Sequence, residues 1–218
     1  MKLLAVRSAK SIWLIPIYFL NPMGRNTRSI VEATKARYGF LKSPFDFPLP
    51  PKENEGLKFL SGAFNTKSGE VQIKSMTLHL DGIVVETSSS TDDSDAFLED
   101  VSIWMNTEYG LPKYSELPIN RLYTSELNLY FEVAPAIFNP KLAAFMEEVS
   151  KAISTDATGP SAFLDFKLET DQTRGKVKTF TLEREINIPI EEKRYYSFSP
   201  TKTSVHVQLL EMFERLAT

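Results

Sequence analysis

The dipeptide Asp81-Gly82 stands between two runs of β-branched and other apolar residues, and it constrains the fold more than any other part of the sequence. A type I′ turn needs positive φ at both central positions, which Asp-Gly readily adopts, so the flanking runs are expected to pair as an antiparallel hairpin. Those runs, residues 70–80 and 83–87, follow a further strand pattern over 57–64. Together the three runs predict a β-meander.

One strand of this meander changes its apolar phase. Val71 and Ile73 alternate in one phase, and Met76 begins another. Because side chains repeat every two residues along a strand, a one-residue shift requires an extra residue, which predicts a bulge near Lys74 or Ser75.

Four segments carry apolar residues at helical spacing beside capping residues. They are a helix capped by Asn26 or Thr27 and running to about Tyr38, a helix that follows the polar run Ser88–Asp95 and ends at Tyr109, a helix over 139–153, and a helix over 204–216. The third is expected to bury Leu142, Phe145, Met146, Val149 and Ile153. The fourth is expected to bury Val205, Leu209, Met212, Phe213 and Leu216.

Further strands are expected in both halves of the chain. The first is a buried strand over 11–20, which should be an edge strand or bulged at Pro16, since proline cannot donate to a strand ladder. The others are expected over 123–133, 162–169, 176–186 and 194–198. The proline-rich segment 43–56 predicts an extended loop.

The order of expected elements repeats as strand, helix, hairpin, further strand, helix. Gly69 and Gly175 are 106 positions apart, which is close to half of the 218 residues. We therefore expect a single α+β domain over 1–218, with antiparallel sheet and helices on one side, formed by an internal duplication with pseudo-two-fold symmetry. The repeated halves are approximately 1–112 and 113–218, each too small for a stable core of its own.

This order of elements resembles the duplicated saddle of TATA-binding-like folds. The resemblance is one of topology, carried by no motif residue, and a shared fold does not transfer a function.

The composition excludes several kinds of site. The chain has no cysteine, which excludes disulfides, thiolate nucleophiles and cysteine-based metal centres. Its two histidines cannot form a site of histidines alone, so no metal and no cofactor is expected. The absence of cysteine suits a reducing compartment, and a cytoplasmic protein is expected.

The N-terminal apolar run 12–20 has basic residues before it, as a signal peptide would. It is only nine residues long and contains Pro16, whereas a membrane span needs roughly 20 residues. A buried strand and no membrane association are therefore expected.

Charge is distributed unevenly along the chain. Residues 1–42 hold eight Lys and Arg and one acid, whereas 43–109 hold four Lys and twelve Asp and Glu. In one interpretation these charges neutralise one another inside the fold. In the other, Arg25 and Arg28 flank the N-terminus of the first helix and bind an anion there, because free backbone N–H groups and guanidinium groups suit a negative partner.

Signals for catalysis are weak. Asp165 and Lys167 on one strand, with Asp156 upstream, have the residue types of a metal-dependent nuclease. The cluster Asp92, Asp93 and Asp95 is interpreted as helix capping, because the spacing of a calcium loop is absent.

The sequence therefore favours a non-enzymatic binding or assembly protein that acts through protein–protein contacts, with a protein partner or a second copy. The alternative is an anion- or nucleic-acid-binding module that uses the basic N-terminal segment. A metal-dependent nuclease or hydrolase is the third interpretation.

Overall fold

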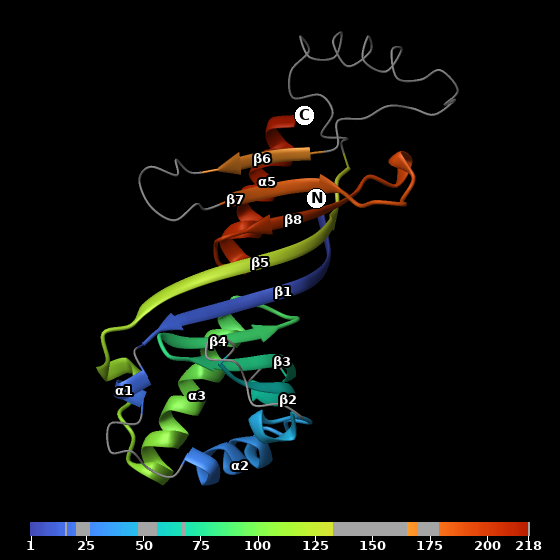
Figure 1. The fold of residues 1–218 in the computed structure, drawn as a ribbon. Coiled ribbons are helices and arrows are strands. Elements are labelled where there is room, and N and C mark those ends of the chain that lie inside the picture. Colours follow the sequence, from blue (N-terminus) through green and yellow to red (C-terminus); the bar gives the residue numbers. More distant parts are fainter. Residues whose placement is uncertain are drawn as a thin grey trace. The chain divides into compact units, whose positions relative to one another are not determined.

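The computed structural model describes residues 1–15, 17–20, 27–47, 56–66, 69–132, 165–169 and 179–217. Strands and helices within these ranges confirm an α+β fold (Figure 1). The strands are β1 (Lys2–Leu14), β2 (Leu57–Thr66), β3 (Gly69–His79), β4 (Gly82–Thr87), β5 (Asn120–Tyr130), β6 (Asp165–Glu169), β7 (Thr179–Arg184) and β8 (Arg194–Ser199). The helices are α1 (Ile17–Leu20), α2 (Thr27–Arg37), α3 (Thr91–Tyr109) and α5 (Thr203–Ala217), with short 3₁₀ turns at Pro44–Asp46, Tyr114–Glu116 and Ile190–Glu192.

The strands form one sheet, hydrogen-bonded in the order β2-β3-β4-β1-β5-β8-β7-β6. Pairing is antiparallel between β1 and β4, β2 and β3, β3 and β4, β6 and β7, and β7 and β8. The register of β3 on β4 shifts between Ile73 and Ser75, which confirms the predicted bulge. The antiparallel sheet is thus confirmed.

The chain divides into two compact units. Unit 1 comprises Met1–Arg7, Glu126–Pro200 and Ser204–Thr218, and unit 2 comprises Ser8–Ser125 and Thr201–Thr203. The long strands β1 and β5 contribute residues to both. Folding of the whole chain as one cooperative domain stays a prediction.

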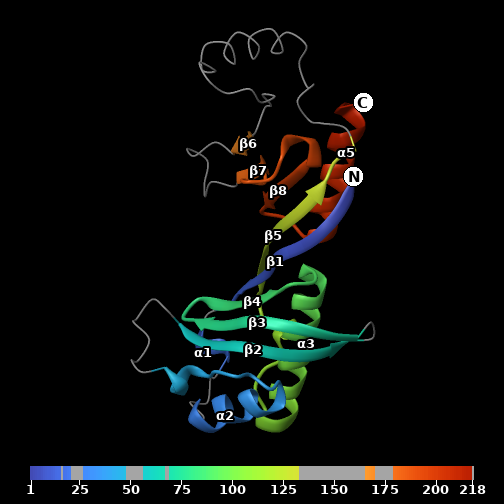
Figure 2. The ribbon, with the colours of Figure 1, turned by 90° about the vertical axis from the view of Figure 1, so that its right-hand side faces the viewer.

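Unit 2 has a core rich in aromatic rings, formed by one face of its strands together with α2 and α3 (Figure 2). Trp13, Phe59 and Phe97 are fully buried there. Helix α3 begins at a Ser90 cap, whose hydroxyl accepts the Asp93 N–H at 3.0 Å. It ends at Gly110 with φ of 61°, a conformation that glycine adopts without steric cost.

Unit 1 has a separate apolar core. Helix α5 packs on the sheet through Leu210, which meets the buried Leu127, Leu129 and Leu182. His206 also lies on this buried side of α5.

Two sequence expectations are wrong. The first strand covers Lys2–Leu14 rather than 11–20, ends before a short helix, and lies inside the sheet rather than at its edge. Pro16 itself lies outside the described residues, as does the helix expected over 139–153. Helix α5 turns its expected core face outward: Val205, Leu209, Met212 and Leu216 are exposed, and only Phe213 of that set packs inward.

Within the described ranges, no helix is both long and apolar enough to span a membrane.

Candidate functional site

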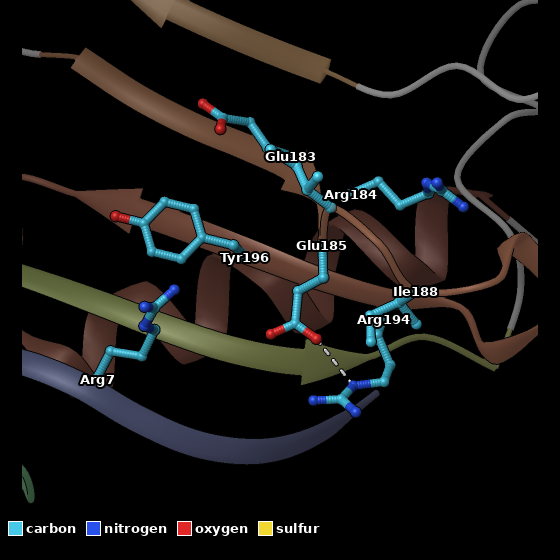
Figure 3. Close-up of a pocket in the computed structure, with 8 residues that line it drawn as sticks. Arg7, Glu183, Arg184, Glu185, Ile188, Arg194 and Tyr196 are labelled. Atoms are coloured by element: carbon cyan, nitrogen blue, oxygen red, sulfur yellow. Dashed lines mark ion pairs between the residues drawn. The ribbon is translucent and has the colours of Figure 1, made fainter.

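A polar pocket of about 380 Å³ lies in unit 1, at the ends of β7 and β8 and beside Arg7 of β1. Its volume is within the range of small-molecule sites. It is lined by three arginines, two glutamates, a tyrosine and two isoleucines, namely Arg7, Arg184, Arg194, Glu183, Glu185, Tyr196, Ile186 and Ile188 (Figure 3).

The connection between β7 and β8 explains why a pocket forms here. In unit 2 the step from β3 to β4 takes only Leu80 and Asp81. The step from β7 to β8 takes residues 185–193 and includes two residues with positive φ, Asn187 at 64° and Lys193 at 48°. The longer connection supplies Glu185 and both isoleucines to the pocket wall.

One ion pair crosses the pocket. Arg194 Nε lies 2.8 Å from Glu185 Oε2, and Asn128 Nδ2 donates to Glu185 Oε1 at 2.5 Å. Figure 3 shows Glu185 pointing toward Arg194, while Glu183 and Arg184 leave β7 in opposite directions. Glu185 therefore neutralises part of the local positive charge, although neither Arg194 Nε nor Glu185 Oε2 makes a hydrogen bond within the described structure.

Arg184 has no such partner among the described residues. Its Nη1 atom is buried yet makes no hydrogen bond. A buried guanidinium nitrogen without an acceptor costs free energy, because its hydration is lost and not replaced. An acceptor group bound in the pocket would remove that cost.

Arg7 and Tyr196 form the other end of the pocket. The Arg7 guanidinium lies 5.4 Å from the centre of the Tyr196 ring, below it in Figure 3. Burial raises the pKa of Tyr196 to about 12, and the carboxylates of Glu126 and Glu183 add to that shift while Arg7 opposes it. Tyr196 is thus a neutral hydroxyl near neutral pH, and a hydrogen bond to the Glu126 carboxylate already engages it.

Of the two arginines predicted from the sequence, only Arg28 is described, and it is not among the residues that line this pocket. Arg25 lies outside the described residues. Arg28 is in the first turn of α2, where its Nε pairs with Glu32 at 3.1 Å and its guanidinium lies 5.6 Å from the centre of the Phe45 ring. Anion binding by Arg25 and Arg28 stays a prediction.

Other basic residues of the N-terminal segment pair with acids of unit 2. Arg37 Nη2 lies 3.2 Å from Asp100 Oδ2, and Tyr38 donates to the same oxygen at 2.7 Å. Lys10 lies 3.6 Å from Glu86. These contacts favour the interpretation in which the uneven charges neutralise each other inside the fold.

The aspartate cluster at the start of α3 is structural. Asp93 belongs to the Ser90 cap, as the capping interpretation predicts. Asp95 is buried and accepts hydrogen bonds from Trp13 Nε1 at 2.9 Å and from Tyr123 OH at 3.0 Å. Lys202 Nζ lies 3.5 Å from the same carboxylate. Positions 95, 98 and 102 follow helical spacing and lie on the buried side of α3. This spacing is the sequence signal that Asp95 is a buried structural residue.

His206 is a packed side chain rather than a catalytic base. Ser197 donates its one hydroxyl proton to the Thr181 carbonyl at 2.6 Å, so His206 Nε2, 2.8 Å away, must donate to Ser197 Oγ. This is the reverse of the proton transfer that activates a serine nucleophile. Burial lowers the pKa of His206 to about 4.

The described residues cover only part of the nuclease interpretation. Lys167 on β6 pairs with Glu169 at 2.6 Å, and Asp156 lies outside the described residues. Over the described ranges, no group of three or more histidine or acidic side chains is arranged to hold a metal ion.

Comparison of the chain with protein-family models, with curated protein sequences and with solved structures found no match. Function is therefore argued from the chain's own residues.

Proposed function

We propose that this chain is a non-enzymatic binding protein that holds an anionic group, a carboxylate or a phosphate, in the polar pocket of unit 1. The observation that carries the proposal is the buried Nη1 of Arg184, which lacks an acceptor among the described residues and lines the pocket. A bound oxyanion would supply that acceptor.

The other lining groups suit the same ligand chemistry. Guanidinium groups remain charged at all physiological pH values and present paired N–H donors that match the oxygens of carboxylates and phosphates. Arg7, Arg184 and Arg194 outnumber Glu183 and Glu185, which leaves one net positive charge. The lining arginines can attract and orient an anion, and we therefore propose binding rather than catalysis.

Assembly through protein–protein contacts is the second candidate. The observation that favours it is the apolar face of α5, since an exposed apolar stripe on a helix suits a packing partner. The nucleic-acid alternative rests on Arg25 and Arg28, and the same two arginines are altered in the control variant below.

We also propose that the chain is an internal duplication of one strand–helix–meander–helix unit. The strand order supports it: β2-β3-β4-β1 in the first half has the same connectivity as β6-β7-β8-β5 in the second. The strands β4 and β8 and the starts of α3 and α5 each lie 112 positions apart.

Individual hydrogen bonds support the same correspondence. The N–H of Ile15 binds the carbonyl of Asp81, just before β4, and the N–H of Phe131 binds the carbonyl of Lys193, just before β8. At the helix starts, the Thr91 N–H binds Thr203 Oγ1 and the Thr203 N–H binds Thr91 Oγ1, at 3.1 and 3.0 Å. Equivalent residues thus make equivalent bonds.

Calorimetric titration with inorganic phosphate and with succinate, at low ionic strength, tests the pocket. We expect Arg184→Gln to raise the Kd of whichever anion binds at least tenfold, because a charge-assisted hydrogen bond contributes roughly 1.5–3 kcal/mol. The two anions distinguish a phosphate ligand from a carboxylate ligand.

The matched control is the double variant Arg25→Gln plus Arg28→Gln, which removes two arginines from the segment that the sequence favoured. We expect its Kd to equal that of the unaltered chain. If the control loses binding while Arg184→Gln keeps it, the anion site lies at α2 and the pocket proposal fails. If neither anion binds at millimolar concentration, both sites are excluded for these ligands.

A further inference from the structure

The polar pocket of unit 1 is bordered by unpaired hydrogen-bonding atoms. Among the described residues, five buried side-chain nitrogen or oxygen atoms lack a hydrogen-bond partner, and four of them belong to Asn128, Arg184, Glu185 and Arg194. The last three of these residues line the pocket, and Asn128 is hydrogen-bonded to Glu185. Native proteins leave few buried polar atoms unpaired, so four of them beside one pocket favour a ligand that pairs with them.

The four atoms are of two kinds. Arg184 Nη1 and Arg194 Nε are donors, whereas Glu185 Oε2 and Asn128 Oδ1 are acceptors. A carboxylate or a fully ionised phosphate could pair with the two donors, but it has no proton for the two acceptors, and the Glu185 carboxylate repels it. The anionic group of the proposed function therefore accounts for only half of the set.

A single hydrogen bond orients the acceptor side. Asn128 Nδ2 donates to Glu185 Oε1 at 2.5 Å, which leaves Asn128 Oδ1 as an acceptor. Arg194 Nε lies 2.8 Å from Glu185 Oε2, close enough for charge attraction, yet the two atoms make no hydrogen bond. The N–H groups of a guanidinium are fixed in its plane, whereas the three N–H groups of a primary ammonium rotate and can pair with two oxygens.

We propose that the ligand of this pocket is a zwitterion that carries a primary ammonium group as well as its oxyanion, as an amino acid does. The ammonium donates to Glu185 Oε2 and Asn128 Oδ1, and the oxyanion accepts from the arginines. Ile186 and Ile188 line the same pocket and suit a short aliphatic chain between the two charges. The inference rests on the proposed function, from which it takes the anionic half of the ligand.

The exposure of the two paired side chains shows how the ammonium enters. The Glu185 side chain is 14% exposed, and a carboxylate so far removed from water needs a charged partner. Because its Oε2 atom is buried, the ammonium reaches that oxygen only when Arg194 moves aside. The Arg194 side chain is 37% exposed, which leaves it room to do so. The ammonium thus replaces one cation with another that can complete the hydrogen bonds.

Calorimetric titration of the unaltered chain with matched pairs of small molecules, at pH 7, tests the inference. Each amino acid is compared with the carboxylate of the same carbon chain: glycine with acetate, β-alanine with propionate, and 4-aminobutyrate with butyrate. We expect at least one amino acid to bind about tenfold more tightly than its carboxylate, because charge-assisted hydrogen bonds are added. Equal Kd values within every pair would overturn the zwitterion and leave the anion proposal standing.

The variant Glu185→Gln separates the two halves of the ligand. It keeps the shape of the side chain but removes the charge that the ammonium needs. We expect it to weaken binding of the amino acid about tenfold and to strengthen binding of the matched carboxylate, since a negative charge leaves the pocket. The matched control is Glu192→Gln, which removes an exposed carboxylate from the same connection between β7 and β8 but does not line the pocket.

The control should preserve the preference for the amino acid. An equal loss of preference in both variants would show a long-range effect of charge and overturn the assignment to Glu185. Propylamine that binds as tightly as 4-aminobutyrate would overturn the proposed function too, because the carboxylate would then contribute nothing. If no amino acid and no carboxylate binds at millimolar concentration, both proposals fail. Should circular dichroism show that Glu185→Gln does not fold, the ligand pairs on the unaltered chain still decide the proposal.

Discussion

Helices α3 and α5 begin at threonines that hydrogen-bond to each other, yet their surroundings differ. At positions that correspond under the proposed duplication, α3 has Phe97 and Trp104, packed on Tyr38, whereas α5 has Leu209 and Leu216, both exposed in the described structure. The strand connections before the two helices differ as well, a two-residue turn in one half and a nine-residue loop in the other. Under the proposed duplication, the strand and helix register has been kept, whereas the surface side chains and the loop lengths have diverged.

The difference shows which parts of such a fold can vary in sequence and which cannot. Backbone pairing and the helix starts need particular residues at few positions, which both halves supply. Backbone pairing places no comparable constraint on side chains of the outer helix face or of the loops. Unit 2 accordingly has a covered aromatic core, whereas unit 1 has a charged pocket. Three measurements sharpen this comparison.

The largest expected effect separates the two helix faces. Phe97→Ala should lower the free energy of unfolding by about 3–5 kcal/mol, because it leaves a cavity among aromatic rings. Leu209→Ala should cost less than about 0.5 kcal/mol, because the Leu209 side chain is exposed in the described structure. Urea unfolding followed by circular dichroism gives both values. Equal losses in the two variants would contradict the difference drawn between the helices.

The second effect separates two equivalent buried residues, His206 and Ser94. The pKa of His206 is lowered in the folded protein to about 4, from an ordinary value near 6.5, so the unfolded chain binds the proton more readily. Stability from this group is therefore full above pH 6.5 and falls as the pH drops toward 4, by about 3 kcal/mol in all.

Unfolding experiments between pH 4 and 7 check this. His206→Gln, which keeps a donor for Ser197, should remove the pH dependence that belongs to this group. Ser94→Ala should leave it unchanged, since a hydroxyl does not titrate there. A wild-type chain whose stability is as independent of pH as the glutamine variant would show that His206 is not held neutral.

The smallest effect concerns how the helices start. Ser90 caps α3, but the equivalent position before α5 is Lys202, which cannot cap a helix N-terminus. Ser90→Ala should cost about 1 kcal/mol, and Lys202→Ala should remove its ion pairs with Asp92 and Asp95 without the loss of a cap. Thermal melts of both variants make the comparison, and a larger loss for Lys202→Ala would reverse it.

Local stereochemistry was the predictable part of this fold. The phase change gave the bulge between Ile73 and Ser75, and Gly110 marked the end of α3. The hairpin between β3 and β4 forms where Asp81-Gly82 predicted it, but its turn residues are Leu80 and Asp81, Gly82 already belongs to β4, and neither Asp81 nor Gly82 has the positive φ expected of a type I′ turn. Each of these features depends on the conformational preference of a few adjacent residues, which a single sequence contains.

Features that depend on distant partners were missed. Helix α5 has two apolar stripes, and the stripe that contains His206 faces the sheet. The sequence does not indicate this choice, because the hydrogen-bond partner of the His206 imidazole is Ser197 on strand β8. The pocket joins Arg7 to residues more than 170 positions away, such as Arg184 and Tyr196. Neither association leaves a local pattern, although the alternating charges of Glu183, Arg184 and Glu185 are a weak signal.

The paired threonines have a consequence for how this chain can evolve. Thr91 and Thr203 each provide the hydroxyl that the other's backbone N–H needs, inside the buried part of unit 2. A substitution that removes either hydroxyl leaves the other threonine's N–H without its acceptor, while the substituted residue still donates its own. The two positions therefore share one selective constraint, and a change at one alters which residues are tolerated at the other.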